Sequence, residues 1–141
     1  MNYIKEYIEQ IDTGKIIAGK KVKKIYKKLL KESDDISLPF YFDEEKGSRP
    51  IEFIETFCKQ AEGEIGKPIK LELFQKAYIQ ALFGFVYRDT GLRRFNETMF
   101  LVGRKNGKTT MLSAIALYMM IADGEGSAEC YSVATKKDQA S

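Results

Sequence analysis

Apolar residues recur at three- and four-residue intervals in the first 33 positions, and this spacing predicts two helices. The apolar face of the first helix consists of Tyr3, Ile4, Tyr7, Ile8 and Ile11. We expect this helix to be interrupted at Thr13 and Gly14. The second predicted helix runs from Gly19 to Glu32, and its apolar side consists of Val22, Ile25, Tyr26, Leu29 and Leu30.

The other side of the second predicted helix is lysine-rich, with Lys20, Lys21, Lys23, Lys24, Lys27 and Lys28. Such a face is usually solvated, and this is the interpretation that we favour. A surface that faces DNA is the alternative.

The middle of the chain contains breaks and two further predicted helices. Leu38 to Gly47 is a predicted break, because a proline and the run FYF precede the acidic turn DEEKG. Pro50 is expected at the first turn of a short helix, which glycines and a proline close between Gly63 and Pro68. A further helical pattern covers Leu73 to Val86.

At Glu97 the pattern changes to that of an α/β protein. The apolar run ETMFLV (97–102) predicts a buried strand, and the run from Gly107 to Ala122 predicts a helix that is apolar almost all round and ends at Asp123 and Gly124. A second strand is predicted at CYSVAT (130–135), with another helix starting in KKDQAS (136–141). We therefore expect an α/β fold, the start of a parallel sheet flanked by helices, preceded by a helical N-terminal region.

Composition excludes several classes of chemistry. The chain has 141 residues, 44% hydrophobic, and a net charge of +3, which indicates a globular protein that tolerates a polyanionic partner without requiring one. It contains no histidine, so Ser-His and Cys-His catalysis and His-ligated metals are excluded. Cys58 and Cys130 are too few for a disulfide framework or a zinc site. No apolar run is long enough to span a membrane and no signal peptide is evident, so we expect a cytoplasmic protein.

The segment GRKNGKTT, residues 103–110, lies between the predicted strand 97–102 and the helix that follows. Backbone N–H groups of such a loop and the helix N-terminus converge on an anion, and Gly103 and Gly107 allow the close approach. Lys108 is expected to reach the β- and γ-phosphates of ATP, and Thr109 to complete the coordination of Mg²⁺. Three residues separate the two glycines, where the usual phosphate loop has four and would place the first glycine at Val102. An ordinary basic turn is the alternative.

The short loop resembles that of the large subunits of viral DNA-packaging terminases, which carry an arginine three residues before the final glycine. The blocks LELFQKAYIQALFGF, TGLRRFNETMFLVGRKNGKTT and YSVATKKDQA are similar to successive blocks of the ATPase domain in that family. The similarity covers roughly residues 51–141. It implies a helical region over residues 1–68 and the N-terminal part of a phosphate-loop ATPase domain over residues 69–141.

The resemblance also implies individual roles. Gln75 corresponds to the glutamine that reads the adenine edge, with an exposed polar position as the alternative. Arg104 corresponds to an arginine that contacts the γ-phosphate and stabilises charge in the transition state, so Lys108 and Arg104 are the predicted catalytic residues. The remaining loop residues expected to contact the nucleotide are Lys105, Asn106 and Thr110. Phe74 packs either near the base or in the core, whereas Arg93 and Arg94 receive no catalytic role.

Hydrolysis of ATP also requires an apolar strand that ends in Asp followed by Glu. The only superficial match is YMMIAD (118–123), which belongs to the predicted helix after Lys108 and is therefore rejected. We expect an incomplete ATPase domain, and whether this chain is itself an enzyme stays open. The resemblance implies double-stranded DNA, a small terminase subunit and a portal protein as partners of the full-length form, which would assemble as a ring. The alternatives are another phosphate-loop NTPase, such as a helicase-like motor, and a non-catalytic prophage remnant.

Overall fold

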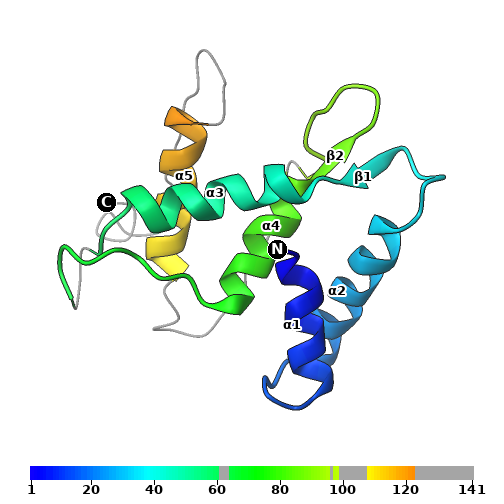
Figure 1. Cartoon of the computed structure of the whole chain (residues 1–141), viewed down its shortest axis with the longest axis horizontal. Coiled ribbons are helices and arrows are strands. Elements are labelled where there is room, and N and C mark those ends of the chain that lie inside the picture. Colours follow the sequence, from blue (N-terminus) through cyan, green and yellow to red (C-terminus); the bar gives the residue numbers. More distant parts are fainter. Residues whose placement is uncertain (61–63, 96, 99–107, 123–141) are drawn as a thin grey trace. The chain divides into compact units, whose positions relative to one another are not determined.

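The computed structural model describes residues 1–60, 64–95, 97–98 and 108–122 (Figure 1). The chain divides into two compact units, Met1–Gly103 and Arg104–Ser141, which are described separately. The first unit contains α1 (Tyr3–Asp12), α2 (Lys20–Ser33), β1 (Phe40–Phe42), α3 (Glu44–Phe57), α4 (Leu73–Gly84) and β2 (Phe85–Tyr87). The second contains α5 (Lys108–Ile121).

Helices α1 and α2 confirm the two helices predicted from the apolar spacing. The backbone N–H of Lys5 donates to the Asn2 side chain at 3.0 Å, which caps the start of α1. The chain then turns through Gly14 at a φ of +79°, a conformation that glycine adopts without strain. The rings of Tyr7 and Tyr26 meet edge to face with centroids 5.4 Å apart, and this contact joins the apolar faces of the two helices.

Helix α3 begins six residues before the predicted start at Pro50, so the prediction of a break through Gly47 was wrong. The Asp43 carboxylate accepts a hydrogen bond from the backbone N–H of Lys46 at 3.1 Å and caps the helix. Glu44 and Glu45 follow in the first turn, where negative charge is stabilised by the helix dipole. The helix therefore starts at these acidic residues, and Pro50 is accommodated inside it.

The sheet of the first unit has two antiparallel strands, β1 and β2, with Tyr41 opposite Val86. The run FYF, predicted as part of a break, is therefore strand β1. Helix α4 confirms the helix predicted from Leu73, but the chain becomes extended at Phe85, where β2 begins. The described part is α/β. The strands predicted for a parallel sheet lie outside the described residues, except for positions 97 and 98, so that sheet stays a prediction.

The core of the first unit gathers residues from α1, α2, α4 and both strands. Its buried members are Ile4, Ile8, Leu29, Phe40, Ala81 and Phe85. Partly buried side chains packed against them are Tyr26, Leu30, Leu38, Phe42 and Phe95.

Two glycines allow α4 to lie close to α3 and β1. A Cβ atom on Gly47 of α3 would lie 2.7 Å from Cγ of Gln80, and one on Gly84 would lie 2.5 Å from a ring carbon of Phe42. Both distances are shorter than van der Waals contact. The absence of a side chain at these two positions therefore sets how closely α4 approaches α3 and β1.

Helix α5 confirms the apolar helix predicted after the glycine-rich loop. It includes residues 118–121, so the rejection of YMMIAD as a strand is also confirmed. The predicted cap at Asp123 and Gly124 and everything after it lie outside the described residues. The predicted division of the chain at residues 68 and 69 stays a prediction.

Candidate nucleotide-binding site

Helix α5 begins at Lys108, the lysine of the predicted phosphate loop. Lys108, Thr109 and Thr110 are consequently the first three residues of a 14-residue helix. Backbone N–H groups in a first helical turn have no partner within the helix, and together with the helix dipole they favour an anion. The side chain of Thr110 is exposed. The predicted loop residues Gly103, Arg104, Lys105, Asn106 and Gly107, and the side chains of Lys108 and Thr109, lie outside what the structure describes.

Gln75 lies in the first turn of α4, where its side chain has a defined structural task. The backbone N–H of Glu72 donates to Oε1 of Gln75 at 2.9 Å, while the Glu72 side chain accepts from the Gln75 backbone. This reciprocal pair is a capping box, which satisfies two N–H groups at the helix start. Gln75 is only 7% exposed, which rules out the exposed polar position that was its alternative. The adenine contact of Gln75 stays a prediction.

Phe74 lies beside Gln75 and lines a groove in the first unit. The groove has a volume of about 680 Å³ and is bounded by α1, α2, α4 and the four residues Arg94, Phe95, Glu97 and Thr98. Its apolar lining includes Val22, Ile25, Phe74, Tyr78, Leu82 and Phe95. The hydroxyl groups of Tyr78 and Thr98 share a hydrogen bond of 2.7 Å, which ties α4 to the start of the predicted strand 97–102.

Arg94, to which the sequence analysis assigned no catalytic role, has a structural role. Its Nη1 lies 2.7 Å from a carboxylate oxygen of Glu32, and both side chains are mostly buried. The guanidinium group stacks 3.7 Å from the ring centroid of Phe40 and 4.9 Å from that of Phe95. A planar cation suits a position that combines an ion pair with aromatic faces. Arg94 therefore joins α2 to β1 just before the predicted strand.

Residues 73–141 match the family described as the terminase large subunit, ATPase domain. This match supports the terminase resemblance of the segment. The chain is also 36% identical over 77 residues to the terminase large subunit of Enterobacteria phage HK97, which covers 54% of this chain and 14% of that protein. No solved structure matches the chain.

The terminase match contains α4 and α5 and leaves α1, α2 and α3 outside it. An ATPase domain implies use of a nucleotide, whereas the identity of that nucleotide and of its metal ion are proposals. In the part of the chain that the structure describes, no cluster of three or more acidic, cysteine or histidine side chains could hold a metal ion. Within the same residues, no helix is both long enough and apolar enough to cross a membrane.

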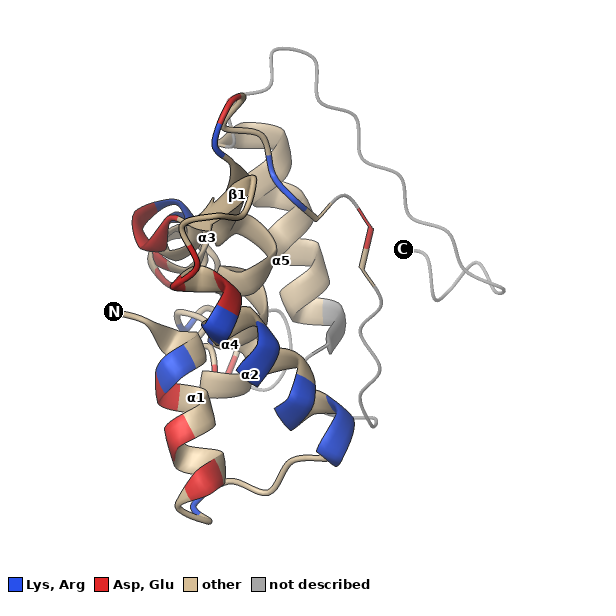
Figure 2. Ribbon diagram, turned by 90° about the vertical axis from the view of Figure 1, so that its right-hand side faces the viewer, with Lys and Arg blue, Asp and Glu red and all other residues tan. Residues whose placement is uncertain are grey.

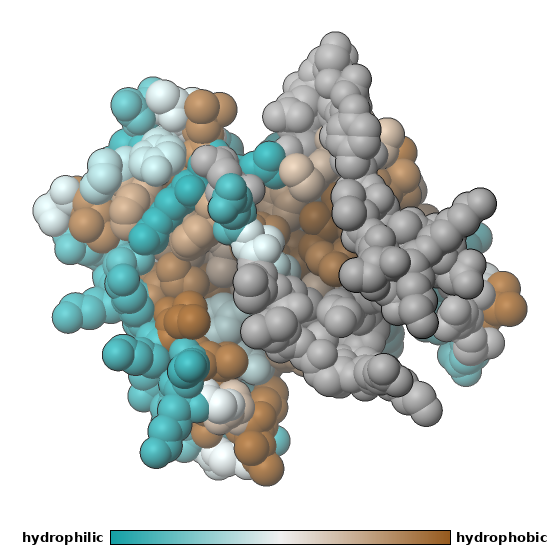
Figure 3. Space-filling view, turned by 180° about the vertical axis from the view of Figure 1, so that it is seen from behind, coloured by the Kyte–Doolittle hydropathy of each residue, from teal (hydrophilic) through white to brown (hydrophobic). Residues whose placement is uncertain are grey.

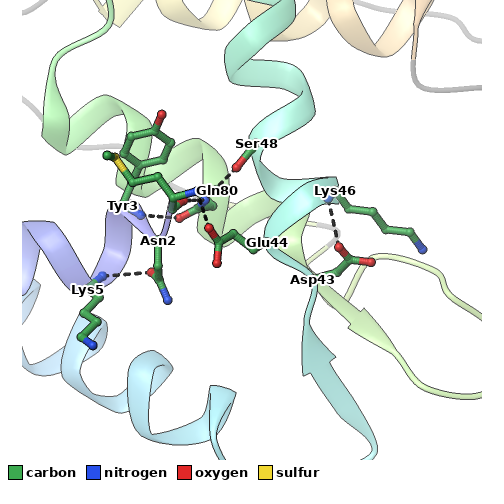
Figure 4. Close-up of polar contacts among 9 residues, drawn as sticks. Asn2, Tyr3, Lys5, Asp43, Glu44, Lys46, Ser48 and Gln80 are labelled. Carbon is green, nitrogen blue, oxygen red and sulfur yellow. Dashed lines mark hydrogen bonds and ion pairs between the residues drawn. The ribbon is translucent and has the colours of Figure 1, made fainter.

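Gln80 connects the segment that matches the terminase family to the helices before it (Figure 4). The sequence analysis did not identify this residue. Gln80 is fully buried in α4. Its Oε1 accepts from the backbone N–H of Tyr3 at 2.8 Å, and its Nε2 donates to the Met1 carbonyl at 2.8 Å and to the Ser48 hydroxyl at 3.0 Å. The detectable signal was a polar residue that shares a helix face with Ala77 and Gly84, both small enough for close packing.

Proposed function

We propose that residues 103–110 bind the β- and γ-phosphates of ATP as the phosphate loop of a terminase large subunit. The observation that carries the proposal is that α5 begins at Lys108, within a segment that matches the terminase ATPase domain. The positive charge of a lysine in the first turn would add to the anion-binding backbone N–H groups there.

Each residue of the loop has a proposed task. Gly103 and Gly107 permit close approach of the backbone to phosphate, and Lys105, Asn106 and Thr110 contribute further N–H groups. Lys108 neutralises charge on the β- and γ-phosphates, and Arg104 binds the γ-phosphate where charge develops during transfer. Thr109 would hold Mg²⁺, which supplies electrostatic stabilisation to the phosphates when bound. Gln75 would orient the adenine.

The proposal for the whole protein is broader than this chain, which covers 14% of the HK97 relative. The full-length form would couple ATP hydrolysis to movement of double-stranded DNA into a capsid and would cut that DNA. It would act in the host cytoplasm as a ring, together with a small terminase subunit and a portal protein.

The nucleotide proposal is tested by equilibrium titration of the chain with a fluorescent ATP analogue in the presence of Mg²⁺. We expect binding that Lys108→Ala weakens by about 10- to 100-fold, because a charge-assisted hydrogen bond contributes about 1.5–3 kcal/mol. Chelation of Mg²⁺ should also weaken binding.

Lys70→Ala is the matched control, since Lys70 is exposed and lies outside the loop. It removes the same charge and should leave the affinity unchanged. Undetectable binding by the unmodified chain, or equal affinities for Lys108→Ala and Lys70→Ala, would refute the proposal.

A further inference from the structure

The lysines of α2 are unevenly distributed around the helix. The 14-residue helix carries seven lysines, and its only acidic residue is Glu32 near the C-terminus. Lys23 and Lys27 turn toward α1, where their ammonium groups lie 2.8 and 3.3 Å from the carboxylate of Asp12. The pKa of Asp12 is lowered by these contacts, first of all by the hydrogen bond from Lys23. The single Asp12 carboxylate therefore engages both ammonium groups of this inner pair within the fold.

The remaining five lysines form an outer row, defined as Lys20, Lys21, Lys24, Lys28 and Lys31, and all are exposed. Successive members lie on one side of the helix because most are three or four residues apart. Figure 2 shows basic residues on successive turns of α2, whereas α1 carries several acidic ones. Within the described residues, only Lys28 of this row has an ion pair, a distant one of 3.9 Å to Glu32. Glu32 lies closer to Arg94, at 2.7 Å, so Lys28 is only weakly engaged.

The outer row opposes the stability of the helix that carries it. Lys20 and Lys21 occupy the first turn, which contains no acidic residue, and the Gly19 cap provides no side-chain hydrogen bond. Positive charge at a helix N-terminus is unfavourable, and lysines four residues apart repel one another. A polyanion bound along this side would relieve both effects.

We propose that the outer row of α2 binds the phosphate backbone of double-stranded DNA. Lys20 and Lys31 are separated by 11 residues, or about 16 Å along the helix axis. Double-stranded DNA carries one negative charge per roughly 1.7 Å of its axis, so a basic row of this length can face several phosphates. The contact is independent of sequence, because phosphates carry no base identity. The choice of DNA rests on the proposed function, in which double-stranded DNA is the partner.

Anionic lipid is the competing polyanion. Val22 and Ile25, on the adjacent side of α2, are 38% and 57% exposed, and a basic helix with exposed apolar residues also suits a membrane surface. Figure 3 shows hydrophobic residues exposed among hydrophilic ones on one face of the molecule. DNA is favoured because Val22 and Ile25 line the groove shared with α4, whereas four of the five lysines of the outer row are not among the residues that line it; Lys28 is.

The test measures binding of a fluorescent 30-base-pair duplex to the full chain across a salt series, without nucleotide. With five phosphate contacts, the logarithm of the affinity should fall with the logarithm of salt concentration at a slope of about −4.5. The triple variant Lys20→Gln, Lys21→Gln, Lys24→Gln should reduce the magnitude of this slope by about 3 and weaken binding on the order of 100-fold at about 0.1 M salt. Its thermal stability should be equal or higher, since the change removes unfavourable charge from the helix start.

The control is the triple variant Lys15→Gln, Lys59→Gln, Lys70→Gln, which changes the net charge equally at exposed sites outside α2. It should retain the wild-type slope. Equal losses in both triple variants would show a general effect of net charge and overturn the proposal. Absence of duplex binding by the wild type at low salt would overturn it too. The proposal would also be overturned if the α2 triple variant lost binding to phosphatidylserine vesicles but still bound the duplex like the wild type. Lys108→Ala should bind the duplex normally, so failure of the ATP proposal is distinguishable from failure of this one.

Discussion

Replacement of Gln80 by leucine should destabilise the first unit substantially. The substitution nearly preserves volume but removes hydrogen bonds to the Tyr3 backbone N–H, the Met1 carbonyl and the Ser48 hydroxyl. A typical hydrogen bond contributes about 0.5–1.5 kcal/mol net, and a buried group left without a partner costs about 1–3 kcal/mol. Met1 is 73% exposed and can bond to water instead. The main loss therefore comes from Tyr3 and Ser48, and we expect about 2–4 kcal/mol of unfolding free energy.

The assay is urea unfolding of the full chain, followed by circular dichroism. Gln10→Leu is the matched control, because Gln10 lies in α1 and is only half-buried, and it should change stability by less than about 0.5 kcal/mol. Ser48→Ala alone should cost about 1 kcal/mol. The double variant with Gln80→Leu should be less destabilised than the sum of the two, since the Ser48 hydroxyl is then no longer unpaired. Equal stabilities of Gln80→Leu and Gln10→Leu would refute this account.

Two further predictions concern the packing of α4 and the pairing of α1 with α2. Gly84→Ala should lower stability by about 1–3 kcal/mol in thermal unfolding, although alanine normally favours helix, because its Cβ would lie 2.5 Å from the Phe42 ring. A stabilised variant would contradict that close approach. The lowered pKa of Asp12 means that its stabilising contribution is present above the ordinary aspartate pKa and is lost as pH falls through the folded-state value. Asp12→Asn should therefore be less stable than the wild type at pH 7, and the urea midpoints of the two should converge at acidic pH; a difference independent of pH would exclude this linkage.

The terminase segment and the helices before it are connected through specific polar contacts. Gln80, inside the family match, holds the Tyr3 backbone, and Arg94, also inside it, pairs with Glu32 of α2. Removal of α1 and α2 would leave Gln80 and Arg94 without these buried partners. The N-terminal helices are therefore part of the structural support of α4 and of the segment that leads toward the phosphate loop.

The sequence alone determined where α1, α2, α4 and α5 lie, because an apolar stripe at helical spacing is a local property that each segment carries. It also located the candidate phosphate loop, since glycine, lysine and threonine between a predicted strand and helix are read without knowledge of distant contacts. Tertiary structure decided the rest. FYF is a strand because Phe85–Tyr87, more than 40 residues away, pairs with it. Gln80 is buried because the chain start and Ser48 supply its hydrogen-bond partners, and the lysines of α2 divide into inner and outer sets because Asp12 of α1 lies beside two of them. Such partners are far apart in sequence, so spacing within one segment could not reveal them.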